Sequence, residues 1–80
     1  MTAPHLSPAA ERLLADLRFA GPSARLEYLA DGRWHLRVPD TTSYKRALRG
    51  PVEEIERAGL VVEAPNRPLI RRTLRRAEAA

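Results

Sequence analysis

Cysteine is absent from this chain of 80 residues, which excludes disulfide bonds, thiol catalysis and thiolate zinc sites. Histidine is scarce: only His5 and His35 are present, and their separation is not the spacing of a metal-ligand pair. No serine or threonine stands in a nucleophile-elbow or phosphate-loop pattern. We therefore expect a protein that is not an enzyme and has no metal, no cofactor and no catalytic residues.

Long apolar runs are also absent, and none approaches the roughly 18 residues that a membrane-spanning helix needs. The N-terminal residues Met1 to His5 lack the basic and apolar regions of a secretory signal peptide. These two absences predict a cytoplasmic protein that makes no membrane contact. The length allows one compact domain, which we expect at residues 7–80 after a flexible N-terminal segment at residues 1–6.

Lysine is nearly absent, because arginine supplies 13 of the 14 basic residues that outnumber the 10 acidic ones. The net charge of +4 is unevenly distributed along the chain. Residues 1–40 are neutral, residues 41–50 carry +3, residues 51–63 carry −3 and residues 64–80 carry +4. Arginine favours phosphate and carboxylate partners, because its planar guanidinium donates two parallel hydrogen bonds to them.

The first predicted element is a helix from about Ser7 to Ala20. Ser7 suits the N-cap, Pro8 suits the first helical position, and Gly21-Pro22 ends the helix. Apolar residues recur at helical spacing within it, namely Ala10, Leu13, Leu14 and Leu17. This stripe predicts that one side of the helix packs on the core.

A β-hairpin is predicted next, with alternating apolar and polar residues before and after Asp31-Gly32. A two-residue turn would put the apolar residues of the two strands on opposite faces. A three-residue loop, Ala30-Asp31-Gly32, pairs Tyr28 with Trp34 and keeps those residues on one face, so we predict this bulged loop. The other face then carries Arg25, Glu27, Leu29, Arg33, His35 and Arg37.

Apolar residues from Tyr44 to Ala58 keep one helical phase, which predicts a helix reaching Gly59, with helix caps available in residues 39–43. Pro51 would clash with the carbonyl of Ala47 inside a continuous helix, so a kink is expected there. A short β-branched strand follows at residues 60–64. A last helix is predicted from about residue 67 to the C-terminus.

The predicted order is α-β-β-α(kinked)-β-α, an α+β domain with a two- to three-stranded sheet whose apolar face is covered by helices. A right-handed crossover would place the third strand beside the first. This order resembles that of type II KH domains, α-β-β-α-α-β. That family carries a GxxG loop between its central helices, and the corresponding stretch here, Gly50-Pro51-Val52-Glu53, lacks the second glycine.

Arginines of the predicted last helix carry the main functional hypothesis. At 100° per residue they cover about half of the helix circumference, and apolar residues cover the rest, so the helix would dock and present its arginines to solvent. The candidate nucleic-acid-binding residues are these arginines and a basic cluster before Gly50, namely Arg67, Arg71, Arg72, Arg75, Arg76, Lys45, Arg46 and Arg49. A solvated helix face that complements the helix dipole is the alternative interpretation.

The polar face of the hairpin is a second candidate surface, because Arg25, Arg33 and Arg37 could follow a phosphate backbone. Tyr28 and Trp34 are predicted to face the core, where they cannot stack on bases. Arg25 and Arg37 would face each other across the strands, which is unfavourable without an anion or an acid nearby.

The composition and pattern favour a small domain that binds DNA or RNA through its phosphate backbone. The alternative is a non-enzymatic protein-interaction or homo-oligomeric assembly module. In that case the glutamates at 53–56 of one molecule would meet the arginines of another in a homodimer, or the arginines would meet an acidic protein surface. Leu29 and Val61, apolar on the polar sheet face, favour this alternative.

Overall fold

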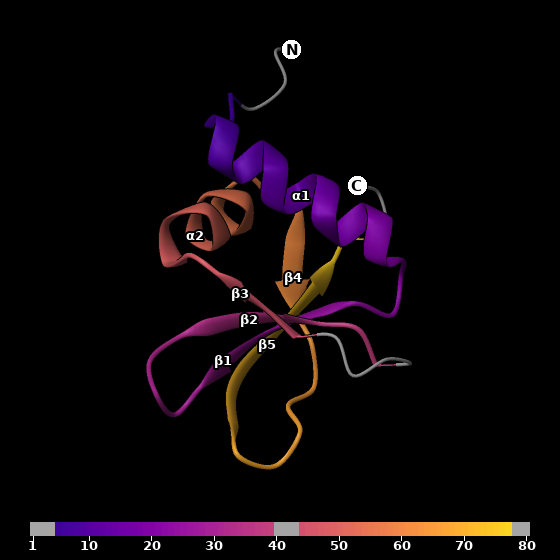
Figure 1. The fold of residues 1–80 in the computed structure, drawn as a ribbon, viewed down its shortest axis with the longest axis vertical. Helices are drawn as coiled ribbons and strands as arrows, with labels where there is room; N and C mark the ends of the chain where they lie inside the picture. Colours follow the sequence, from indigo (N-terminus) through magenta and orange to yellow (C-terminus); the bar gives the residue numbers. More distant parts are fainter. Residues whose placement is uncertain (1–4, 40–43, 78–80) are drawn as a thin grey trace.

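A computed structural model describes residues 5–39 and 44–77, where the chain forms two helices and a five-stranded antiparallel sheet (Figure 1). The helices and strands are α1 (Pro8–Ala20), β1 (Arg25–Leu29), β2 (Trp34–Arg37), β3 (Tyr44–Ala47), α2 (Arg49–Arg57), β4 (Val61–Glu63) and β5 (Ile70–Arg76). The strand order is β3-β2-β1-β5-β4. The α+β class is therefore confirmed, but the sheet has more strands than the two or three predicted. Most of the N-terminal segment at 1–6 lies outside the described residues.

Both helices cover the same face of the sheet, and the core lies between the two layers (Figure 1). The core consists of apolar side chains from both helices and all five strands, namely Ala10, Leu13, Leu17, Ala24, Leu26, Trp34, Leu36, Ala47, Val52, Ile55, Val61 and Leu74. The opposite face of the sheet has no helix over it in the described residues. We call it the open face.

The structure confirms the helix predicted from Ser7 to Ala20, which is α1. The Ser7 hydroxyl accepts a hydrogen bond from the Ala10 N–H at 3.2 Å, and Pro8 occupies the first helical position. Gly21 ends the helix with φ of 95°, a backbone conformation that an L-residue adopts only with strain.

The hairpin register is also confirmed. Tyr28 pairs with Trp34, and the Leu29 N–H donates to the carbonyl of Arg33 at 3.0 Å. Gly32 has φ of 80°, as the bulged three-residue loop requires. The tilted rings of Tyr28 and Trp34 lie 5.1 Å apart on the helix-covered face, where both were predicted to be.

The predicted helix from Tyr44 is wrong in its first part. Residues 44–47 form strand β3, which pairs with β2, and α2 begins only at Arg49. Pro51 lies in the first turn of α2, where the helix needs no N–H donor, so a kink is unnecessary. The caps expected at residues 40–43 lie outside the described residues.

The predicted C-terminal helix is wrong as well, because residues 70–76 form strand β5. This strand pairs with β1 on one side and with β4 on the other, so β4 is not beside β1 as predicted. Val61 packs in the core rather than on the polar face, and only 2% of it is exposed. The observed order, α-β-β-β-α-β-β, also differs from the KH order.

Candidate nucleic-acid interface

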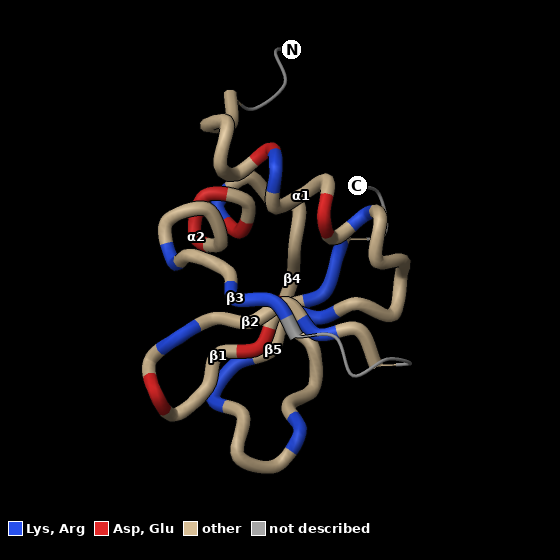
Figure 2. Tube along the Cα trace, viewed as in Figure 1, with Lys and Arg blue, Asp and Glu red and all other residues tan. Residues whose placement is uncertain are grey.

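Arginines are concentrated on the strands of the sheet and the loops that join them, while most of the described acidic residues lie on the two helices (Figure 2). Strand alternation and the observed registers place Arg25, Arg33, Arg37, Arg46 and Arg75 on the open face, and Arg67 reaches it from the β4–β5 loop. Arg71 is exposed and is the residue without a pairing partner where β5 shifts register opposite Tyr28 and Leu29, and its alternation with Arg72 puts it on the same face. The described strands contribute one acid to it, Glu27. The open face is therefore strongly basic.

Three of these arginines lie side by side on β2, β1 and β5, and we call Arg37, Arg25 and Arg75 the arginine row. Arg25 pairs directly with Arg37. On its other side, the pair Leu26–Leu74 brings Arg25 next to Arg75, and both of these arginines line one cavity. Neighbouring strands are about 4.8 Å apart, so the row holds like charges at short range, which is destabilising in the free protein.

Glu27 supplies the acid beside the row. Its side chain is 1% exposed, and its two carboxylate oxygens accept hydrogen bonds from Nε and Nη2 of Arg67, each at 2.9 Å. Nη1 of Arg37 lies 3.8 Å from the same carboxylate. Because a buried carboxylate needs this compensation, Arg67 is occupied by Glu27 and is a structural residue of the face.

Strand geometry divides the predicted arginine array between two faces. Arg71 and Arg75 lie on the open face, whereas Arg72 and Arg76 lie on the helix-covered face with Leu74. The guanidinium of Arg72 lies 5.6 Å from the centre of the Trp34 ring. This side chain also forms ion pairs with two glutamates, Glu56 and Glu63. Hydrogen bonds to these carboxylates raise the pKa of Arg72 above its ordinary value, and the bond to Glu56 contributes more than the bond to Glu63.

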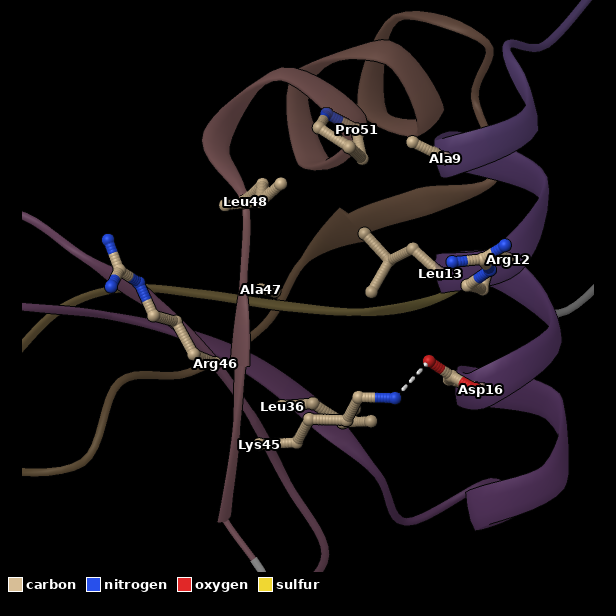
Figure 3. A pocket seen from close by; sticks show the side chains of 10 residues that line it. All are labelled: Ala9, Arg12, Leu13, Asp16, Leu36, Lys45, Arg46, Ala47, Leu48 and Pro51. Atoms are coloured by element: carbon tan, nitrogen blue, oxygen red, sulfur yellow. Dashed lines mark hydrogen bonds and ion pairs between the residues drawn. The ribbon is translucent and has the colours of Figure 1, made fainter.

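The basic cluster before Gly50 is divided in the same way. Nζ of Lys45 is 2.8 Å from Oδ2 of Asp16 on α1, so Lys45 faces α1, while Arg46 points away from α1 (Figure 3). This ion pair lies beside a mainly apolar cavity of about 170 Å³ between α1 and β3. Arg49 pairs with Glu53 of the next helical turn at 3.1 Å.

Three of the eight predicted binding residues therefore lie on the open face without an ion pair among the described residues, namely Arg46, Arg71 and Arg75. The residues of the second candidate surface, Arg25, Arg33 and Arg37, lie on the same face, where Arg37 forms an ion pair with Glu27. One signal in the sequence could have shown that the two candidate surfaces are a single surface. In residues 71–75, Arg71, Thr73 and Arg75 alternate with Arg72 and Leu74, and this period of two is typical of a strand beside the hairpin.

His35 lies on the same face, with Nε2 3.9 Å from Oδ2 of Asp31. Within residues 5–39 and 44–77, no group of three or more His, Asp and Glu side chains is placed to hold a metal ion. No helix in this part of the chain is long and apolar enough to cross a membrane.

The chain matches no protein-family model, no curated protein and no solved structure. Its function therefore has to be inferred from the surface described above.

Proposed function

We propose that this protein binds nucleic acid through the open face of its sheet. The arginine row carries the proposal, because Arg25, Arg37 and Arg75 repel one another in the free protein and a polyanion relieves that repulsion. Two exposed arginines extend the basic surface beyond the row: Arg46 on the edge strand β3, and Arg71, four residues from Arg75 along β5. The phosphate backbone, with its closely spaced charges, is the polyanion that fits such a surface.

Binding is expected to depend on phosphates rather than on base stacking. Tyr28 and Trp34, the aromatic residues of the hairpin, pack on the helix-covered face and are not available to bases. Arginines that contact phosphates position a protein on the strand but carry little sequence information. We therefore expect weak sequence preference and strong salt dependence.

A salt titration of affinity tests the proposal. If the five arginines each neutralise one phosphate, the slope of log affinity against log salt is about −4.5 on duplex DNA and about −3.5 on a single strand. A triple variant, Arg46→Gln, Arg71→Gln and Arg75→Gln, is expected to make this slope shallower by about 2.7 on duplex DNA and about 2.1 on a single strand. These side chains form no ion pair within the described chain, so the variant should stay folded.

The matched control changes three exposed arginines of the helices instead, Arg12→Gln, Arg18→Gln and Arg57→Gln. Its net charge equals that of the test variant, so a general charge effect would lower both affinities equally. Equal losses in the two triple variants, or no binding of the unmodified protein at low salt, would contradict the proposal.

Assembly through complementary patches has less support from the geometry. All three glutamates of α2 have partners in the same molecule, because Glu53 pairs with Arg49, Glu54 with Ser7 and Glu56 with Arg72. Two of these carboxylates are therefore ion-paired, and the third is hydrogen-bonded, without a second copy. Light scattering at several protein concentrations separates the two candidates, since assembly predicts a dimer in the absence of nucleic acid.

A further inference from the structure

We propose that a cavity on the open face holds the terminal phosphate of a nucleic-acid strand, as a phosphomonoester dianion. This inference rests on the proposed function and specifies one contact of it. The cavity has a volume of about 200 Å³ and is lined by Ser23, Arg25, Glu27, Arg37, Arg67 and Thr73, together with two prolines. One water needs only about 15 Å³, so a phosphate group has ample room.

The charge of the cavity suits a dianion. Arg67 occupies both oxygens of the buried Glu27 carboxylate, so these two charges compensate each other. Among the described residues that line the cavity, Arg25 and Arg37 remain as an excess of two positive charges. A phosphomonoester carries about −1.5 to −2 at pH 7 and presents three acceptor oxygens, whereas an internal phosphodiester carries only one charge.

The guanidinium of Arg25 is held in position before any ligand binds. Its Nη1 donates to the carbonyls of Pro22 and Ala24, each at 3.0 Å, and its other N–H groups make no hydrogen bond within the described residues. Arg37 is oriented by Glu27, 3.8 Å away. Donors fixed in this way lose little conformational entropy when they bind an anion.

The buried hydroxyl of Thr73 is further evidence for a ligand in the cavity. Thr73 lines the cavity, is 2% exposed, and its hydroxyl makes no hydrogen bond within the described residues. A buried hydroxyl without a partner destabilises the free protein. A phosphate oxygen would accept a hydrogen bond from this hydroxyl and satisfy it.

The experiment compares one single-stranded oligonucleotide with and without a 5′ or 3′ terminal phosphate, using the full chain. We expect a terminal phosphate to raise affinity about tenfold, equivalent to one strong charged contact. Thr73→Val should reduce this gain, because the phosphate then loses the hydroxyl as a hydrogen-bond donor. Thr73→Ser retains the hydroxyl and should retain the gain.

Stability gives a readout that does not depend on binding. Thr73→Val removes a buried hydroxyl that has no partner, so it should raise Tm by about 5 °C. A lower Tm would show that the hydroxyl is already satisfied in the free protein, and this would overturn the proposal.

Failure of this inference is distinguishable from failure of the proposed function. Equal affinity for the two forms of the oligonucleotide overturns the cavity proposal but not nucleic-acid binding. If neither form binds, the proposed function fails, and the proposed strand-end ligand fails with it. A titration with inorganic phosphate, followed by the NMR shifts of Thr73 and Arg25, then decides whether the cavity binds a phosphate group at all. The affinity for adenosine monophosphate is measured as well. If it equals the affinity for the phosphorylated strand, the cavity does not recognise a strand end, and the proposal is overturned.

Discussion

Glu27 and Arg67, which are 40 residues apart in the sequence, form a two-pronged ion pair on the open face, with two N–O distances of 2.9 Å. The pair ties the β4–β5 loop to the centre of the sheet. Because Glu27 is 1% exposed, removing Arg67 takes two hydrogen bonds of 2.9 Å from a buried carboxylate, while Arg37 lies farther away at 3.8 Å.

We therefore expect Arg67→Ala to lower the free energy of unfolding by about 2–3 kcal/mol. Urea denaturation measures the loss. Adding Glu27→Gln to this variant should restore part of the stability, because the buried charge is then absent. An exposed arginine on the same face, Arg71, is the control: Arg71→Ala should leave stability within about 0.5 kcal/mol. Similar losses in both single variants would contradict a special role for Arg67.

Arg71 and Arg72 are neighbours in the sequence but lie on opposite faces of β5. Arg72→Gln removes contacts with Trp34 and two glutamates and should destabilise the protein by about 1 kcal/mol. Arg71→Gln should leave stability unchanged and make the salt slope of nucleic-acid binding shallower by about 1. Denaturation and binding measured on both variants test the strand register, and the opposite pattern would show that the faces are exchanged.

Glu54 of α2 holds the start of α1 through Ser7. Its two carboxylate oxygens accept hydrogen bonds from the Ser7 N–H at 2.5 Å and from the Ser7 hydroxyl at 2.9 Å, and these bonds lower the pKa of Glu54. Because the folded pKa is below the unfolded value, the stabilisation is present above the unfolded pKa and is lost as pH falls through the folded pKa.

The difference in Tm between the unmodified protein and Glu54→Gln should therefore be largest near neutral pH and shrink below about pH 4. Thermal denaturation across this pH range measures it. Glu11→Gln, an exposed change on α1, controls for the loss of one negative charge. A Tm difference that is constant with pH would contradict the hydrogen-bonded carboxylate.

Leu69 precedes β5 with φ of 72° and is 93% exposed. A residue with a β carbon is strained in this left-handed conformation, by roughly 1–2 kcal/mol. Leu69→Gly should therefore stabilise the protein by about 0.5–1 kcal/mol, after the entropy that glycine loses on folding. Leu69→Ala keeps the β carbon and should bring no gain, so equal effects of the two changes would argue against backbone strain.

Local features of the sequence were sufficient for the first half of the fold. Ser7, Pro8 and Gly21 set the limits of α1 through hydrogen bonds and backbone angles within a few residues. The register of β1 and β2 followed from alternation and from Gly32, because a shift of one residue would move every apolar side chain to the wrong face. Both features depend on contacts that are close in sequence.

The arginine-rich segment shows where local pattern becomes ambiguous. In residues 70–76, the apolar residues Ile70 and Leu74 are four positions apart with arginine doublets after each, and this spacing fits a helical stripe as well as a strand. Pairing with β1 and β4 decides for the strand, because Leu74 then enters the core at 0% exposure. Residues 44–47 are a similar case, since β3 exists through its pairing with β2.

The sequence by itself determined the excess of arginine, the α+β class, helix α1 and the face of the hairpin on which each side chain lies. Only the tertiary structure decided which arginines share a surface. A helix would have kept Arg71, Arg72, Arg75 and Arg76 together, whereas the strand sends alternate residues to opposite faces. That choice depends on hydrogen bonds to β1 and β4, which are distant in the sequence, and it brings Arg75 beside Arg25 and Arg37.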